Sequence, residues 1–274
     1  MAAKLKPEKV DIAEKDAKKR AKKLRVIVDK VLKETDPDPK RKAGESEKDW
    51  EKRKKSQRNK RNWIAWHFMY IMWHESLHAT KRKQMKKGPG RGLMQFEPAT
   101  IQDLLKQYIL PNKPASNLKR RKRIIRNLAN AAGVKCKEME EALEAFAKSE
   151  KAKANGWPGS SSKAGKLEKW LLESDTFAIK LMRCQFKRYG AHRFPGDKDK
   201  YEGKPQVEKA KEAHAEGWAE WWKKKFKATK DCTEKEVREK KKKEFKGNAE
   251  NLDKKVKDPK KKVGIIGRPD VYEP

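Results

Sequence analysis

Apolar side chains are confined to a few stretches of this chain, and this distribution constrains the fold more than any other feature. They cluster near residues 62–110, 122–147, 168–194 and 213–226. They recur there at helical spacing, and alternating β patterns are nearly absent. The remaining sequence is mostly Lys, Glu, Asp and Ala. We therefore predict a mostly α protein in which only part of the 274 residues forms the core.

The same distribution predicts three regions. Residues 1–60 form a charged helical arm, in which apolar positions recur from Val10 to Val31 until the breaker Asp36-Pro37-Asp38-Pro39. Residues 61–230 form the main domain, and residues 231–274 a flexible, Lys-rich tail with almost no core-forming side chains. Within the main domain we expect helices near 62–80, 94–110, 117–132, 134–147, 167–190 and 207–227, with loops at 86–91, 155–162 and 192–205.

The charge balance points to an anionic partner. Lys and Arg total 74 against 40 Asp and Glu, a net charge of +34. Such an excess attracts polyanions in a salt-dependent way, so DNA and anionic cell-envelope polymers are both candidates. The alternative is a solvated, self-repelling surface.

Cysteine usage and hydropathy exclude several classes of protein. The three cysteines, Cys136, Cys184 and Cys232, stand alone, which argues against a disulfide framework or a zinc site, and we expect no cofactor. The first residues lack the apolar core of a secretory signal. No run of about 18 apolar residues exists, so we expect no transmembrane segment.

Glu75 is an anomaly in the most apolar helix. It continues a stripe formed by Ile64, Phe68 and Ile71. Burial disfavours a carboxylate and raises its pKa, and a glutamic acid that keeps its proton at neutral pH can serve as a general acid. The alternative is a glutamate at a helix end that faces water.

A glycine-rich loop follows Glu75. Gly88, Gly90 and Gly92 allow close backbone approach or positive φ, and Gln95 supplies an amide. A sugar chain in a groove needs such donors and acceptors. Leu93 and Met94 fit either the groove or the core.

Glu75-Ser76, followed by Gly92-Leu93-Met94-Gln95-Phe96-Glu97-Pro98-Ala99-Thr100, resembles the motif of the SLT-type lytic transglycosylases of the lysozyme-like superfamily. The Gln-Phe-Glu-Pro-Ala-Thr variant is most similar to their phage-encoded branch. The resemblance covers about 62–110 well and about 170–230 loosely. It implies a lysozyme-like domain that cleaves the MurNAc–GlcNAc β-1,4 bond of peptidoglycan.

The resemblance also implies roles for individual residues. Glu75 would act as acid and then as base, while the 6-hydroxyl of the muramic acid attacks; Glu97 and Asp103 would be surface charges. Where the family carries a tyrosine this chain has Phe226. Either Tyr189 or Tyr70 replaces the missing hydroxyl, or the activity is weakened, or a position other than Phe226 corresponds to the tyrosine of the family. The implied substrate-binding residues are Ser76, His78, Gly92, Leu93, Met94, Gln95 and Tyr189.

Two alternatives stay open. His74-Glu75-Ser76-Leu77-His78 also matches the His-Glu-x-x-His pattern of zinc proteases, with His192 or His214 as distant third ligands. The chain could instead be a non-catalytic, DNA-associated structural protein of a phage that keeps a lysozyme-like fold. As an enzyme, it would belong in a phage virion, tail or interior, beside other virion proteins, or in the host cytoplasm before release to the periplasm.

Overall fold

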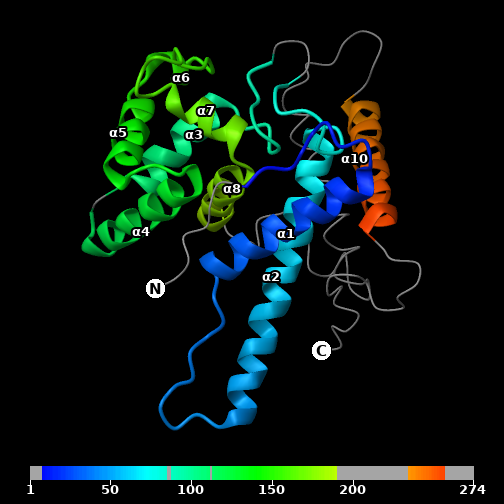
Figure 1. Cartoon of the computed structure of the whole chain (residues 1–274), viewed down its shortest axis with the longest axis vertical. Helices are drawn as coiled ribbons and strands as arrows, with labels where there is room; N and C mark the ends of the chain where they lie inside the picture. The colour runs from blue at the N-terminus through cyan, green and yellow to red at the C-terminus, as the bar shows by residue number, and fades with distance from the viewer. Residues whose placement is uncertain (1–7, 85–87, 112, 190–233, 257–274) are drawn as a thin grey trace. The chain divides into compact units, whose positions relative to one another are not determined.

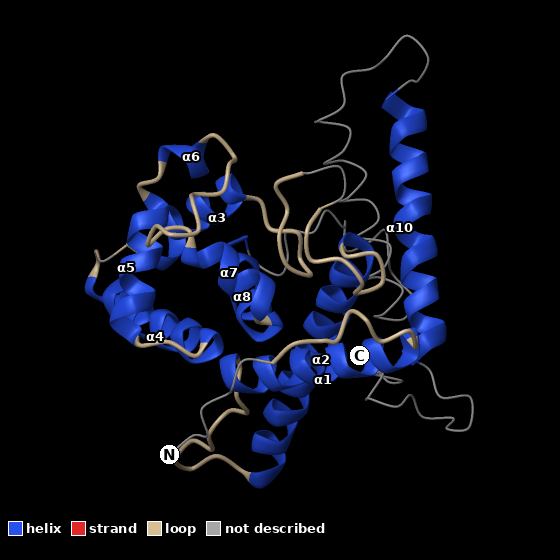
Figure 2. Cartoon of the chain, turned by 45° about the horizontal axis from the view of Figure 1, so that its top comes forward, coloured by secondary structure: helices blue, strands red, loops and turns tan. Residues whose placement is uncertain are grey.

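The computed structural model describes residues 8–84, 88–111, 113–189 and 234–256. These residues form helices joined by loops, with two isolated β-bridges and no strand among them, which confirms the predicted mostly α class (Figures 1 and 2). Within the described ranges, no helix combines the length and apolar character needed to cross a bilayer.

The chain divides into two compact units. Unit 1 comprises Met1–Lys15 and Glu75–Gly190, and unit 2 comprises Asp16–His74 and Ala191–Pro274. Helix α2 (Glu47–Glu75) runs through residue 60 without a break. It ends at Glu75, so the end predicted near residue 80 is wrong.

Helix α1 (Ala17–Thr35) of unit 2 follows the predicted apolar spacing along its own length. Leu24, Val28 and Val31 are fully buried on one face. The helix ends just before the Pro-rich breaker, as predicted. It begins later than the spacing suggests, because the Asp16 side chain accepts hydrogen bonds from the backbone N–H groups of Lys18 and Lys19 and caps the helix there.

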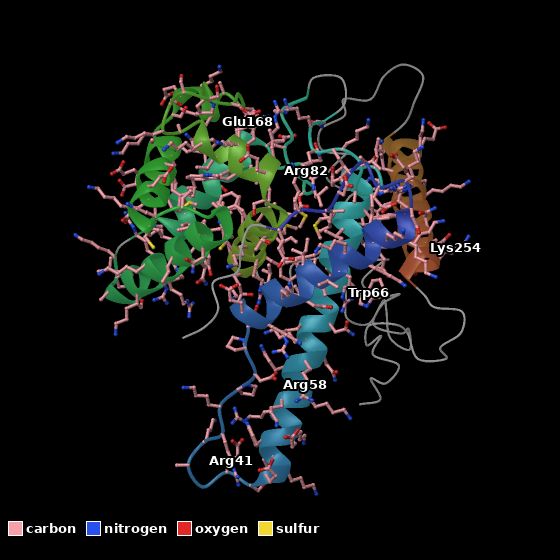
Figure 3. The ribbon with its side chains drawn as sticks, viewed as in Figure 1. Arg41, Arg58, Trp66, Arg82, Glu168 and Lys254 are labelled. Atoms are coloured by element: carbon pink, nitrogen blue, oxygen red, sulfur yellow. The ribbon has the colours of Figure 1, made fainter. Side chains whose placement is uncertain are left out.

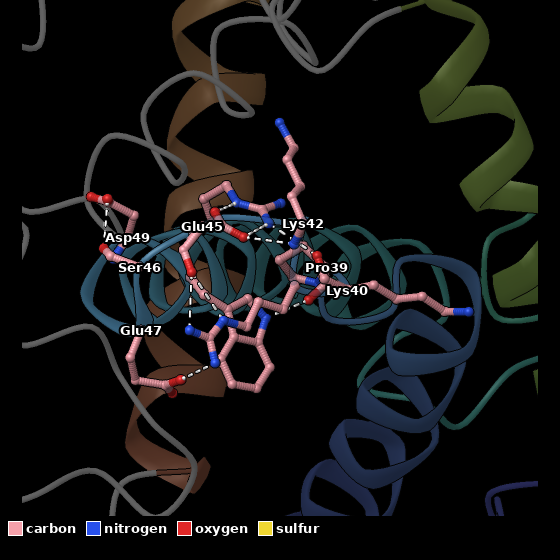
Figure 4. Close-up of polar contacts among 10 residues, drawn as sticks. Pro39, Lys40, Lys42, Glu45, Ser46, Glu47 and Asp49 are labelled. Atoms are coloured by element: carbon pink, nitrogen blue, oxygen red, sulfur yellow. Dashed lines mark hydrogen bonds and ion pairs between the residues drawn. The ribbon is translucent and has the colours of Figure 1, made fainter.

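The loop between α1 and α2 is held by side chains of α2 (Figure 4). Trp50 Nε1 donates to the Pro39 carbonyl at 2.9 Å, and Arg53 Nε donates to Glu45 Oε1 at 2.5 Å. The pKa of Glu45 is lowered to about 2, mainly by Arg53 and then by the Lys42 backbone N–H. These contacts fix the connection between the two helices.

Helix α10 (Glu234–Val256) lies in the region predicted to be a flexible tail, and it is a packed helix of unit 2. Phe245, Ala249 and Leu252 are buried at helical spacing. Tyr70 donates its hydroxyl proton to Asp253 Oδ1 at 3.0 Å, and Asn248 Nδ2 lies 2.8 Å from His74 Nδ1. Three small or apolar positions in a Lys-rich segment are enough to form this face, which average composition conceals.

Unit 1 carries the remaining helices (Figure 1). They are α3 (Pro98–Leu104), continued by the π-helical turn η2 (Leu105–Ile109), then α4 (Ala115–Ala132), α5 (Cys136–Ala147), α6 (Glu150–Lys153), α7 (Lys166–Glu173) and α8 (Asp175–Tyr189). Helix α4 packs against both α5 and α8. The predicted helices at 117–132 and 134–147 and the predicted loop at 155–162 are confirmed.

The single helix predicted for 167–190 is wrong, because α7 and α8 are separated at Ser174. The Ser174 hydroxyl donates to the Ala131 carbonyl at 2.7 Å and accepts from the Phe177 backbone N–H at 3.1 Å. It therefore caps a new helix, a role that serine favours.

Candidate functional site

Glu75 is the last residue of α2, and its side chain is half-buried. Ser76 is fully buried, and its hydroxyl accepts a hydrogen bond from the Ala79 backbone N–H at 3.0 Å. Leu77, His78 and Ala79 follow with φ values of 48°, 60° and 61°. Non-glycine residues pay roughly 1–2 kcal/mol each for this left-handed conformation, so the turn must be held by its surroundings. The chain therefore reverses immediately after the carboxyl group.

The Gly-Leu-Met-Gln segment forms a second tight turn. The Arg91 and Phe96 backbones bond to each other in both directions, at 3.0 and 2.9 Å. Gly92 has a φ of +72°, and a Cβ on it would lie 3.0 Å from the Leu171 carbonyl oxygen. Position 92 therefore favours glycine for two reasons: its positive φ and its close approach to α7.

Gln95 lies inside this turn, with a φ of 48°. Its Nε2 donates to the Gly92 carbonyl at 2.8 Å, while its buried Oε1 has no hydrogen-bond partner in the described part of the chain. The side chain is folded back onto its own turn and keeps one acceptor uncommitted. Leu93 and Met94 are buried and help to form the core beneath the turn.

Arg91 anchors this turn through residues that sequence reasoning missed. Its Nε lies 2.6 Å from Glu168 Oε1, and its Nη1 donates to the carbonyls of Gly88 and Gly90. Its guanidinium also lies over the Trp157 ring, 5.8 Å from the centroid. No local pattern signals these contacts, because Glu168 is 77 positions away in sequence.

Arg82 and Asp175 form a buried ion pair in the same unit (Arg82 and Glu168 are labelled in Figure 3). Asp175 Oδ2 lies 2.7 Å from both Arg82 Nη2 and the Val10 backbone nitrogen. Burial raises the pKa of Asp175, although Arg82 and the Val10 N–H oppose that shift. The Arg82 carbonyl accepts from the Gly92 N–H at 2.8 Å, so the pair connects the N-terminal segment and α8 to the Gly92 turn.

Three other residues of the predicted site, His78, Tyr189 and Tyr70, lie in different segments of the chain. His78 is half-buried within the left-handed turn. Tyr189 ends α8, but its side chain lies outside the described part of the chain, as do residues 190–233 with Phe226. Tyr70 is buried in unit 2, with its hydroxyl on Asp253.

The His-Glu-x-x-His pattern does not lie on one helix. Because α2 ends at Glu75, His78 is beyond the helix, whereas the zinc-protease arrangement needs both histidines on one helical face. Among the described residues, no group of three or more His, Cys, Asp or Glu side chains could hold a metal ion. His192 and His214 lie outside those residues.

Comparisons of the chain with protein-family models, with curated proteins and with solved structures find no match.

Proposed function

We propose that this chain is a peptidoglycan-cleaving lytic transglycosylase, with Glu75 as its single acid and base. The observation that supports this best is local. A half-buried glutamate ends an apolar helix, and a left-handed reversal and a compact Gly92–Phe96 turn follow within one unit. This arrangement leaves the carboxyl group at a helix end beside tightly folded backbone.

The reaction needs one carboxyl group in two protonation states. The Glu75 acid gives its proton to the glycosidic oxygen as the bond to the muramic acid anomeric carbon breaks. The resulting carboxylate then takes the proton of the 6-hydroxyl, whose oxygen forms the new bond to that carbon. The products are a free GlcNAc hydroxyl and a 1,6-anhydro muramic acid, and no water is consumed.

The acids Glu97 and Asp103, which follow Glu75 in sequence, both have structural partners, and this favours the one-carboxylate reaction over a two-carboxylate hydrolysis. Glu97 Oε2 accepts a hydrogen bond from Asn155 Nδ2 at 3.1 Å. Asp103 forms an ion pair with Arg188. Each of the two carboxylates therefore has a partner within unit 1.

Hydrogen bonds to the glycan would come from the region of the Gly92 turn, where the buried Gln95 Oε1 is an acceptor that a small shift of the turn would open to the sugar. An acceptor oxygen of this kind suits an acetamido N–H group, which every sugar of the polymer carries. We place such an enzyme in a phage virion or among its lysis proteins, because the motif is most similar to the phage-encoded branch.

Zymography on purified peptidoglycan tests the proposal, with Glu75→Gln as the variant and Glu97→Gln as the matched control. Glu75→Gln should lower turnover by at least about a hundredfold, since general acid–base catalysis contributes roughly 10²–10⁴-fold. Glu97→Gln should retain most activity, and the products should carry 1,6-anhydro ends. Full activity of Glu75→Gln would overturn the assignment. Reducing ends that contain solvent oxygen would show hydrolysis instead.

A further inference from the structure

Helix α4 has a basic face that the proposed glycan chemistry does not use. Lys119, Lys122, Arg123 and Arg126 are all exposed and stand at positions i, i+3, i+4 and i+7. They share one side of the helix, which we name the α4 basic face. The buried side chains of α4, Ile124, Ile125, Leu128, Ala129 and Ala131, lie on its other side.

Nothing on the helix neutralises this face. The sequence of α4 contains no acidic residue. None of the four cations of the α4 basic face forms an ion pair within the described part of the chain. At a rise of about 1.5 Å per residue, the face presents four charges within roughly 10 Å.

The acids of the adjacent helix α5 are already committed to other cations. Glu140 and Glu144 both pair with Arg121, which leaves the other α4 cations unmatched. Glu138 pairs with Lys166 and Glu141 with Lys163. The neighbouring negative charge is thus used up, and the basic face stays available to an external anion.

We propose that the α4 basic face binds the phosphate backbone of duplex DNA without sequence preference. Four positive charges on one rigid helix repel one another, and a polyanion relieves that repulsion. Duplex DNA carries one negative charge per about 1.7 Å of its axis and releases condensed counterions when cations bind, whereas a flexible wall polymer of lower charge density gains less. The face contains only Lys and Arg, which contact phosphate oxygens and thereby position a protein on the duplex.

The basic half of α2 provides a contrast within the same chain. Lys48, Lys52, Lys55 and Lys60 are also exposed, but Glu47, Asp49 and Glu51 are interspersed among them and are exposed as well. Its local field is therefore mixed in sign. Replacing these four lysines offers a control that removes the same number of positive charges from a different arrangement of charge.

The test measures binding of a fluorescent 30-base-pair duplex to the full chain over a range of salt concentrations. In the test variant Lys119, Lys122, Arg123 and Arg126 become Gln. In the control Lys48, Lys52, Lys55 and Lys60 become Gln, so both variants lose four charges. Glutamine keeps helix propensity, and circular dichroism verifies the fold of each.

The α4 variant should bind at least tenfold more weakly. Its slope of log K against log salt should become shallower by up to about 3.6, since each of the four phosphate contacts contributes about 0.9. The control should change that slope by less than 1. Equal losses in both variants would show a diffuse charge effect and overturn the proposal. So would wild-type binding to poly(glycerol phosphate) as tight as to the duplex. These readouts need no lytic activity, so they stand or fall separately from the role of Glu75.

Discussion

The buried ion pair of Arg82 and Asp175 makes the strongest energetic prediction for unit 1. Asp175 is fully buried and Arg82 is 6% exposed, so solvent screens their interaction little. Removing one partner of such a pair leaves an uncompensated buried charge, which costs about 3–5 kcal/mol. Asp175→Ala also removes the acceptor of the Val10 N–H. We expect it to lower the free energy of unfolding by about 3–5 kcal/mol.

A double-mutant cycle separates the pair from its neighbours. Urea unfolding at neutral pH, followed by circular dichroism, is measured for Arg82→Ala, for Asp175→Ala and for the double variant. Because the second substitution removes a charge that the first left unpaired, the double variant should lose less than the sum of the single losses, by at least about 1.5 kcal/mol. Asp175→Asn keeps an oxygen for Val10 and should fall between wild type and Asp175→Ala.

The exposed pair of Lys163 and Glu141 is the matched control, because it lies in the same unit with side chains 66% and 39% exposed. Replacing either partner should have little measurable effect, as is usual for ion pairs at the surface. Two results would refute this prediction. The losses in free energy of unfolding from Arg82→Ala and Asp175→Ala could be simply additive in the double variant, or they could be no larger than those of the control pair. Either result would show that the two charges do not depend on each other in the folded state.

Three further predictions concern single positions. Gly92→Ala should destabilise the protein by about 1–3 kcal/mol, because the new Cβ would lie beside the Leu171 carbonyl and the positive φ is unfavourable for alanine. Gly44→Ala is the control, because Gly44 also has a positive φ (+73°) but open space around it, so its cost in urea unfolding should be smaller. Equal costs for the two variants would rule out an effect of the contact with Leu171. Iodoacetamide at mildly alkaline pH should label the exposed Cys136 in the folded protein but the buried Cys184 only after unfolding. The reason is that burial raises the pKa of Cys184 to about 12, so its thiol stays protonated. Peptide mapping that finds both cysteines labelled in the folded protein would contradict this prediction. The Glu45 carboxyl should titrate near pH 2 when followed by NMR. Its contribution to stability is therefore present above about pH 4.5 and is lost as the pH falls toward 2. Titration near pH 4.5 would show that Arg53 does not pair with Glu45 when the protein is in solution.

Local patterns in the sequence predicted most helices of the described chain. Periodic apolar positions predicted the buried face of α1, and the Pro-rich breaker predicted its end. Glycine at position 133, with a φ of 73°, closes α4 where the apolar spacing stops. These features depend on neighbours within a few residues, which the sequence displays directly.

The candidate site was predicted only in part. Glu75 does lie on the apolar helix, but that helix ends at Glu75 and not near residue 80, whereas Gly92 does stand in a tight turn with positive φ. The sequence could not predict that the Gln95 amide donates to the Gly92 carbonyl or that Arg91 forms an ion pair with Glu168. Whether an amide or a guanidinium meets solvent or a partner depends on contacts that no local pattern encodes.

The sequence by itself therefore determined the helical class and the presence of an acid on the most apolar helix, because backbone propensity and amphipathic spacing act over a few residues. Only the tertiary structure decided that Phe245 and Leu252 pack within a Lys-rich segment and that Asp175 is buried against Arg82. It alone decided that the α5 acids go to other cations and leave the α4 basic face unmatched. The physical reason is that burial and charge pairing join residues far apart in sequence, and the same side chain is either solvated or paired according to what the fold brings beside it.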